Sequence, residues 1–573
     1  MSDTSIDFRD YENNLLFIPL GGSNEIGMNV NLYHYHGKWL MVDCGSGFAD
    51  DRLPGVDMIV ANLDFIVEKK DDLLGIVLTH AHEDHLGGVQ YLIDKLECNI
   101  YATNFTANFL KVRLAEFGVK YEDKIITVEP EAKISLTPFE LEMIGLTHSA
   151  PEMQAIMVRT AAGNVLHTGD WKFDTDPLLG SLSNTQALEA CGNEGVLALV
   201  CDSTNVFKQG KSLSEGELKA SLVNIVRECK KMVTITTFAS NLARLSMVID
   251  IAKQVGRKVV LTGRSLNRVL SSAQASGYLQ DLDHMIDEGN IGKYKREEVL
   301  VVATGCQAEP LAACAKIANN EHKSINFAPG DTVIFSSKII PGNDIRIFRL
   351  FNQLIKSKIE IITEKSHFVH VSGHPPVEEL KMMYALTKPK ICIPVHGEPF
   401  HIHEHAKLAK RSGVPAAIEV ENGSVVLLSQ DDSRIIGKVP TGYLAVDGHF
   451  LIPTDSHIFT ARRKIRDLGI CVVHVILNKN DKVVHKPNFL TPGLLDTKLD
   501  SDLIDSVKSG IVEEIIAHRS KYLATKGDGV FANSGRYAID NREAETIIRQ
   551  YVRRILRNKL GKTPMVLVTV DRI

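Results

Sequence analysis

The chain has 573 residues, of which 44% are hydrophobic and 24% are charged, and its formal net charge at pH 7 is -5. This length is too great for one hydrophobic core and predicts two to four domains of an ordinary globular protein. The charge excludes a generally basic surface, so any binding of nucleic acid must come from a specific site. No apolar run reaches the roughly 18 residues that a membrane helix needs, and the polar start is unlike a leader peptide.

The nine cysteines are scattered along the chain, and none forms a CxxC pair. Their spacing disfavours a thiolate zinc site, and their odd number argues against a closed disulfide framework. We therefore expect a soluble protein of a reducing compartment, most simply the cytoplasm, that does not bind membranes.

Short apolar runs that end in polar turns fill the chain from about residue 15 to residue 200. Four of them predict buried strands: "KWLMVDCG", "LLGIVLTH", "NVLHTGD" and "VLALVCDS". After Asp202 the pattern changes, and Ser214 with Glu217 forms a capping box ahead of a predicted helix. Strands then alternate with helices up to about residue 365, which predicts a separate unit with a parallel sheet.

The pattern of the first part returns in "HFVHVSGHPP" and "KPKICIPVHGE". We therefore interpret the middle unit as an insertion into the first domain. A third segment holds two long helical patterns, one running through Lys521 and one from Arg542 to Leu560, and a final strand "MVLVTV". The predicted boundaries are a first domain at 1–205 and 366–455, the inserted domain at 206–365, a linker at 456–485 and a C-terminal domain at 486–573.

Five places put metal-capable side chains directly behind an apolar run, and the densest is "LTHAHEDHLGG" at residues 78–88. Because the carboxyl ends of strands open into a shared crevice, we expect these side chains to converge. Imidazole and carboxylate without thiolate suit zinc or manganese. The residues concerned are His80, His82, Asp84, His85, His148, Asp170, His396 and Asp43.

Residue spacing narrows the kind of metal site. His80 and His82 are two apart, so they face the same side of an extended segment. His82 and His85 are three apart, whereas a helical zinc-protease box needs a spacing of four, and that class is excluded. Two interpretations of Asp43 remain open: it hydrogen-bonds turn amides, or it orients a ligand histidine.

The loop "THAHEDH" resembles the signature of the metallo-β-lactamase fold, and the inserted unit resembles the β-CASP domain of the nucleic-acid-processing branch of that superfamily. Further motifs, in order along the chain, are together similar to bacterial ribonuclease J: "GGSNEIGMN", "CDSTN", "TTFASN", "TGCQAEP", "HVSGH" and "PVHGE". The resemblance covers nearly the whole chain. It implies an α/β fold, with a metallo-β-lactamase αββα sandwich, an inserted β-CASP α/β domain and a small C-terminal α/β domain.

The resemblance also implies a centre of two divalent metal ions, zinc first, with manganese or magnesium as alternatives. A hydroxide activated by both ions would attack the phosphodiester, because paired cations lower the pKa of water and neutralise charge in the transition state. Asp84 would orient or deprotonate the nucleophile, and His374 would contact the scissile phosphate. The implied ligands are His80, His82 and His148 for one ion and Asp84, His85 and His396 for the other, with Asp170 between them.

The resemblance implies that two segments bind RNA, and the alternative that remains open is ordinary turn chemistry of their Ser and Gly residues. Ser372 and Gly373 with the local amides can form a nest for a phosphate, and Ser240 precedes a strong helical pattern whose start favours anions. Phe238 would either stack on a base or pack in the core. The segments are Phe238, Ala239 and Ser240, and His370, Val371, Ser372, Gly373 and His374.

Two other patterns are interpreted as structural. "HIHEHAKLAK" carries His401 and His405 four apart on a predicted helix, but the lysines that follow favour a solvated helix face over a metal site. The basic run "RQYVRRILRNKL" is amphipathic, which favours a packed helix or a subunit contact over an RNA-binding surface.

The expected function is that of a metal-dependent ribonuclease, a hydrolase with 5′-to-3′ exonuclease and endonuclease action on single-stranded RNA in rRNA processing and mRNA decay. The expected partners are 5′-monophosphorylated RNA, further copies of the chain in a homodimer or homotetramer, and an RNA-decay assembly. The alternatives are a metal hydrolase of DNA, β-lactams or thioesters, and a scaffold without catalysis. The inserted domain argues against small substrates, and the complete ligand set argues against lost catalysis.

Overall fold

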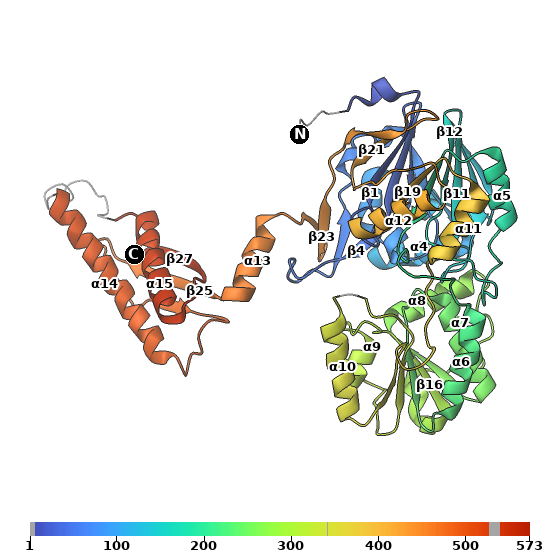
Figure 1. Cartoon of the computed structure of the whole chain (residues 1–573). Coiled ribbons are helices and arrows are strands. Elements are labelled where there is room, and N and C mark those ends of the chain that lie inside the picture. Colours follow the sequence, from blue (N-terminus) through green and yellow to red (C-terminus); the bar gives the residue numbers. More distant parts are fainter. Residues whose placement is uncertain (1–5, 341, 527–538) are drawn as a thin grey trace. The chain divides into compact units, whose positions relative to one another are not determined.

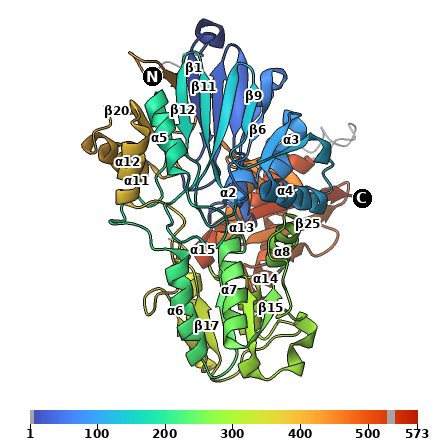
Figure 2. The same cartoon turned by 90° about the vertical axis from the view of Figure 1, so that its right-hand side faces the viewer.

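The computed structural model describes residues 6–340, 342–526 and 539–573 (Figures 1 and 2). It divides into two compact units, the first within residues 1–47 and 59–444 and the second within 48–58 and 445–573. None of the described helices combines the length and the apolar character that a membrane span requires.

Two sheets lie face to face at the centre of the first unit (Figure 2). The eight-stranded sheet has the order β22 (Arg434–Lys438), β21 (Ser424–Leu428), β1 (Leu15–Gly21), β2 (Val30–Tyr35), β3 (Lys38–Val42), β6 (Leu73–Val77), β7 (Ile100–Thr103) and β8 (Ile125–Val128). The seven-stranded sheet has the order β20 (Ala416–Ala417), β19 (Ile391–Val395), β13 (Ala198–Asp202), β12 (Gly163–His167), β11 (Gln154–Thr160), β10 (Phe139–Gly145) and β9 (Lys133–Leu136). Their inner faces form one core, to which Phe17, Tyr33 and Val165 contribute.

Helices cover the outer face of each sheet, which confirms the predicted αββα sandwich. The eight-stranded sheet is covered by α3 (Val89–Leu96) and α4 (Asn104–Phe117), and the seven-stranded sheet by α5 (Thr185–Glu194), α11 (Val377–Thr387) and α12 (Pro399–Arg411). Along β13, Val200 faces the other sheet and Leu199 faces the helices, as expected for a strand buried on both sides. The segment "HLGGVQYLIDKL" has the residue pattern of one helix, but it is interrupted at its two glycines, so that α2 (Glu83–Leu86) precedes α3.

The inserted domain has the predicted parallel sheet, because every strand pair within it runs parallel. The order is β15 (Lys258–Thr262), β16 (Val299–Ala303), β14 (Val233–Thr236), β17 (Thr332–Phe335) and β18 (Glu360–Ile362). The helices are α6 (Glu215–Glu228), α7 (Leu242–Val255), α8 (Arg264–Ala275), α9 (Ala313–Ala318) and α10 (Asp344–Lys356) (Figure 1). Ser214 and Glu217 form the predicted capping box at the start of α6.

The insertion leaves and re-enters the sandwich between two neighbouring strands. The chain departs after β13 and returns through α11 to β19, and β13 pairs with β19 in parallel, with Asp202 opposite Val395. Because parallel neighbours end at the same edge of a sheet, the loop after Asp202 and the loop after Val395 lie side by side.

The second unit contains the predicted small α/β domain. Its sheet has the order β26 (Asn488–Leu490), β25 (Ile470–Leu477) and β27 (Met565–Arg572), and its helices are α13 (His457–Leu468), α14 (Ser501–Lys526) and α15 (Asn541–Leu560). Residues 456–485, expected as a linker, thus include α13 and the central strand β25. Val552 and Leu556 of α15 are buried in the core of this domain, so the basic amphipathic run is a packed helix.

A further sheet contains β24 (Phe450–Pro453), β23 (Tyr443–Asp447), β5 (Met58–Ala61) and β4 (Ser46–Phe48).

Candidate metal centre

Loops at the carboxyl ends of strands in the sandwich bring seven histidines and aspartates together. They follow β6, β10, β12 and β19, as expected from the apolar runs that precede them in the sequence. Two groups of donors result, and within each group one ligand atom of every residue lies within 4.8 Å of the others. The groups are His80, His82, His148 and Asp170, and Asp84, His85, Asp170 and His396.

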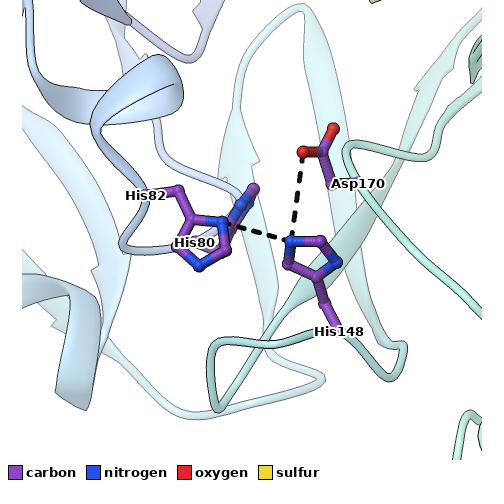
Figure 3. Close-up of side chains that lie close together, drawn as sticks. All are labelled: His80, His82, His148 and Asp170. Atoms are coloured by element: carbon purple, nitrogen blue, oxygen red, sulfur yellow. Dashed lines mark hydrogen bonds and ion pairs between the residues drawn. The ribbon is translucent and has the colours of Figure 1, made fainter. Parts of the chain in front are cut away.

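The first group consists of the imidazole rings of three histidines and the carboxylate of Asp170 (Figure 3). Nδ1 of His82 lies 3.1 Å from Nε2 of His148, and Oδ2 of Asp170 lies 4.0 Å from the same Nε2. Nε2 of His80 is buried and has no hydrogen-bond partner. His148 donates from Nδ1 to the carbonyl oxygen of Gly373 at 2.7 Å, which leaves its Nε2 unprotonated toward the centre.

In the second group, imidazoles are interleaved with carboxylates. His85 approaches Asp170 through Nε2 at 3.2 Å and Asp43 through Nδ1 at 2.7 Å. His396 approaches Asp84 through Nε2 and Asp170 through Nδ1, both at 3.2 Å. Asp170 is therefore common to the two groups, with one carboxylate facing His85, His148 and His396.

Burial and charge give the two groups opposite electrostatic character. Burial lowers the pKa of His80 and His148 well below the usual value and that of His82 to about 4. These rings are therefore neutral, which is the form that binds a cation. Burial acts in the same direction on His85 and His396, but nearby carboxylates outweigh it and raise the pKa of His396 to about 10.

Asp43 has both of the roles left open by the sequence. It accepts a hydrogen bond from the backbone amide of Thr79 at 2.8 Å, in the turn that follows β6. Its other oxygen accepts from Nδ1 of His85 and directs Nε2 of that ring to the centre.

Asp202 is a member of the site that was not predicted from the sequence. It is the last residue of β13, and its Oδ2 accepts from Nδ1 of His374 at 2.8 Å, while Oδ1 lies 3.2 Å from Nδ1 of His396. With Asp170, His374 and His396 it forms a third cluster of possible donors. The signal was present, because Asp202 ends its apolar run in the same way as Asp170 ends the run "NVLHTGD".

The two segments expected to bind substrate take different places. Asn205 donates to Oγ of Ser372 and to the carbonyl oxygen of His374, both at 2.9 Å, which ties residues 370–374 to the loop after β13. In this segment Val371 is buried, and burial lowers the pKa of His370 to about 3. Residues 238–240 connect β14 to α7, and the cap of that helix is Asn241 rather than Ser240. The Phe238 side chain is partly exposed, which is compatible with either of its two interpretations.

The histidines of α12 correct one sequence interpretation. His405 is fully buried, and its Nδ1 lies 2.8 Å from Oγ of Ser203, so the expected solvated face is wrong for this residue. It shares the buried face of α12 with Ile402 and Ala409, at helical spacings of three and four. His403 is exposed beside Glu419, as expected.

Three family models match successive parts of the chain. Residues 26–201 match the metallo-β-lactamase superfamily, residues 230–354 match the ribonuclease J β-CASP domain, and residues 358–420 match the Zn-dependent metallo-hydrolase RNA specificity domain. Among solved structures, a protein of unknown function from Enterococcus faecalis V583 is similar with a TM-score of 0.51 and 17% identity, covering 73% of this chain and 100% of that one. This last likeness concerns the fold alone.

Curated proteins named ribonuclease J are similar over almost the full length. The protein from Sinorhizobium meliloti is 38% identical over 568 residues, which cover 98% of this chain and 97% of the relative. The protein from Synechocystis is 30% identical over 97% of this chain and 86% of the relative, and that from Thermus thermophilus is 32% identical over 87% and 89%. The chain therefore belongs to the ribonuclease J family of metal-dependent ribonucleases, within the metallo-β-lactamase superfamily.

Proposed function

We propose that the chain hydrolyses single-stranded RNA at a centre of two divalent metal ions, zinc first among them. The observation that carries this proposal is the convergence of seven donors into two groups that share Asp170. Nε2 of His80 supports it, because a buried polar atom without a partner is costly and a cation would satisfy it. The proposed ligands are His80, His82, Asp84, His85, His148, Asp170 and His396.

Divalent ions would supply Lewis acidity there, favouring deprotonation of water and neutralising charge on the phosphodiester oxygens. Asp84 would hold the attacking water and accept its proton. Burial alone would raise the pKa of Asp84, but the neighbouring His85 and His396 keep it well below the usual range, and bound cations would supply the positive charge in their place once these rings act as neutral ligands.

His374 would contact the scissile phosphate and protonate the leaving oxygen. Burial would lower its pKa, but Asp202 and Asp170 outweigh this effect and raise it, which favours the doubly protonated ring. Nδ1 donates to Asp202, and Nε2 is therefore left as the donor toward substrate. Asp202 acts as a positioning residue that fixes the orientation of this ring.

Residues 370–374, with Phe238, Ala239 and Ser240, would bind the RNA backbone and hold a 5′-monophosphate. A held 5′ end sets the register for removal of one nucleotide at a time, and an RNA that enters without this contact would be cut internally. We further propose that the chain acts in the cytoplasm as a homodimer or homotetramer. Light scattering of the purified protein would measure its oligomeric state.

The test compares cleavage of a 5′-monophosphorylated RNA by the wild-type enzyme and by His80→Ala and Asp84→Ala variants. Removing a residue that only hydrogen-bonds a metal ligand typically lowers metal affinity or activity about 10–100-fold. Removing a ligand itself should therefore lower kcat/KM by at least about a hundredfold. His403→Ala, which removes an exposed histidine from α12, should behave as the wild type. Undiminished cleavage in metal-free buffer would count against the metal centre.

Substrate class is tested with strands of matched sequence. RNA should be cut and DNA spared, and duplex RNA should resist. Changing the 5′ end from a monophosphate to a triphosphate should slow release of the first nucleotide while internal cuts continue. Equal cleavage of RNA and DNA would overturn the proposed specificity.

A further inference from the structure

Two phenylalanine side chains stack on each other at the surface of the first unit. The ring centroids of Phe207 and Phe400 are 4.5 Å apart and the planes are inclined by 21°, the smallest angle among the described ring pairs. Phe400 is 66% exposed and Phe207 is 43% exposed. The pair therefore presents aromatic surface to water instead of contributing to a core.

Phe207 lies in the loop after β13, and Phe400 lies in the first turn of α12, directly after the loop that carries His396. Phe207 comes two residues after Asn205, whose amide holds Ser372 and the carbonyl of His374. Phe400 comes four residues after His396, and Oγ1 of Thr204 lies 2.9 Å from Nδ1 of His396, which joins the loops to each other. The stacked rings thus come from segments that adjoin, along the chain, two parts of the candidate site.

Positive charge accompanies the rings. Lys208 follows Phe207 directly, and Lys338 lies after β17; both are exposed. Burial is the main cause of the low pKa of His370, but the charges of Lys208 and Lys338 also lower it, and Lys338 acts on His401 as well. The edge of His401 contacts Phe207, with centroids 5.3 Å apart. Lys208 is thus the sequence neighbour of Phe207, and the charge of Lys338 acts on both His370 and His401.

We propose that Phe207 and Phe400 form a stacking surface for an unpaired base of the RNA substrate, and that Lys208 and Lys338 bind the phosphates beside that base. This inference rests on the proposed RNA hydrolysis and extends the binding site beyond the scissile phosphate. Every base has a π face, so such a surface accepts any sequence. Bases inside a duplex are covered by their neighbours, so the surface favours single strands.

The first experiment measures initial cleavage of 5′-monophosphorylated RNA by the holoenzyme. Phe400→Ala should lower kcat/KM roughly tenfold, chiefly through KM, because stacking of one base is typically worth that much. Phe400→Trp should retain activity, since it keeps an aromatic face. Phe450→Ala, which removes a phenylalanine that is 72% exposed in the second unit, serves as the matched control and should leave kcat/KM unchanged.

A second experiment locates the base. A series of RNAs each carries one abasic nucleotide at a different position. With the wild type, an abasic nucleotide at one of these positions should lower kcat/KM about as much as Phe400→Ala does. The same abasic nucleotide should cause no further loss in Phe400→Ala, because both changes remove the same contact. If the loss caused by the abasic nucleotide and the loss caused by Phe400→Ala add at every position, the stacking surface is overturned.

The outcomes separate the two proposals. If the wild type does not cleave RNA, the proposed function fails and the stacking surface fails with it. If the wild type cleaves RNA and Phe400→Ala cleaves it equally well, only the stacking surface is overturned. A variant with unchanged KM but altered mass in light scattering would show that the pair is a contact between copies of the chain, which also overturns the inference.

Discussion

At the scale of single residues, Gly373 connects the substrate segment to the metal centre. Its carbonyl oxygen accepts the Nδ1 proton of His148 and so fixes which nitrogen faces the candidate centre. A Cβ at this position would lie 2.6 Å from Cε1 and 2.8 Å from Nδ1 of that ring. Glycine is therefore required here by space, because only it permits the carbonyl to approach the imidazole so closely.

We expect Gly373→Ala to displace His148 and to lower metal affinity and kcat/KM by about 10–100-fold, the range for loss of a contact that orients a ligand. Calorimetric titration with zinc and initial rates on RNA measure the two effects. Gly289→Ala is the control, because a Cβ there meets nothing within 4 Å. Wild-type affinity in Gly373→Ala would show that the carbonyl does not orient the ring.

Individual residues could be predicted from the sequence where their spacing carries the information. The four donors His80, His82, Asp84 and His85 stand within six positions, and this density by itself indicates a metal loop. Asp202 was missed because a single carboxylate after a strand is common. The burial of His405 was missed because it depends on the opposing sheet, and the lysines that follow it in the sequence gave no indication of that packing.

At the scale of elements, a buried ion pair joins two helices of the inserted domain to residues 370–374, the segment proposed to bind RNA. Arg244 of α7 is fully buried and pairs with Glu215 of α6 at 3.1 Å. It also donates to the carbonyl oxygen of Ser336, and Oγ of Ser336 donates to the carbonyl oxygen of Val369 at 2.7 Å. Val369 immediately precedes residues 370–374, so these contacts hold the start of that segment against the inserted domain.

Arg244→Met should destabilise the first unit by about 3–5 kcal/mol, because it leaves the Glu215 carboxylate buried without a partner. The double variant Glu215→Leu with Arg244→Met should recover most of that loss, since both charges are gone. Urea unfolding followed by circular dichroism measures these differences. A double variant no more stable than Arg244→Met would contradict the pairing.

Most elements of the inserted domain were predicted because strong local patterns coincide there with capping residues and glycines. The sequence predicts a linker where strand β25 lies, although every second residue of this strand is buried in the structure. Its parallel partner β27 lies at the far end of the chain, so nothing local showed that residues 470–477 occupy the centre of a sheet. The two glycines that interrupt α2 and α3 illustrate the same limit, because Gly88 packs closely against the backbone of Gly45.

At the scale of the whole molecule, the candidate centre would couple metal binding to the stability of the first unit. Its donors come from both sheets of the sandwich, and the second unit contributes none of them. A cation that binds only the folded chain adds its binding free energy to that of folding.

Zinc added to metal-free protein should raise the melting temperature of the first unit by several degrees, since a ligand at a hundred times its Kd adds about 2.7 kcal/mol. Differential scanning calorimetry measures the shift, and a separate transition of the second unit should stay in place. His80→Ala should respond less than the wild type. An equal shift in that variant would place the stabilising ion elsewhere.

The side-by-side arrangement of β13 and β19 has a consequence for the newly made polypeptide. His80, His82, His148 and Asp170 are all translated before the inserted domain begins, but His396 and its strand are translated after that domain ends. A chain still growing through the insertion carries six of the seven donors and lacks His396 and the strand β19 that precedes it. With the proposed ligands, the centre would therefore be complete only after His396 has been translated, and a product that ends within the insertion would lack one of its donors.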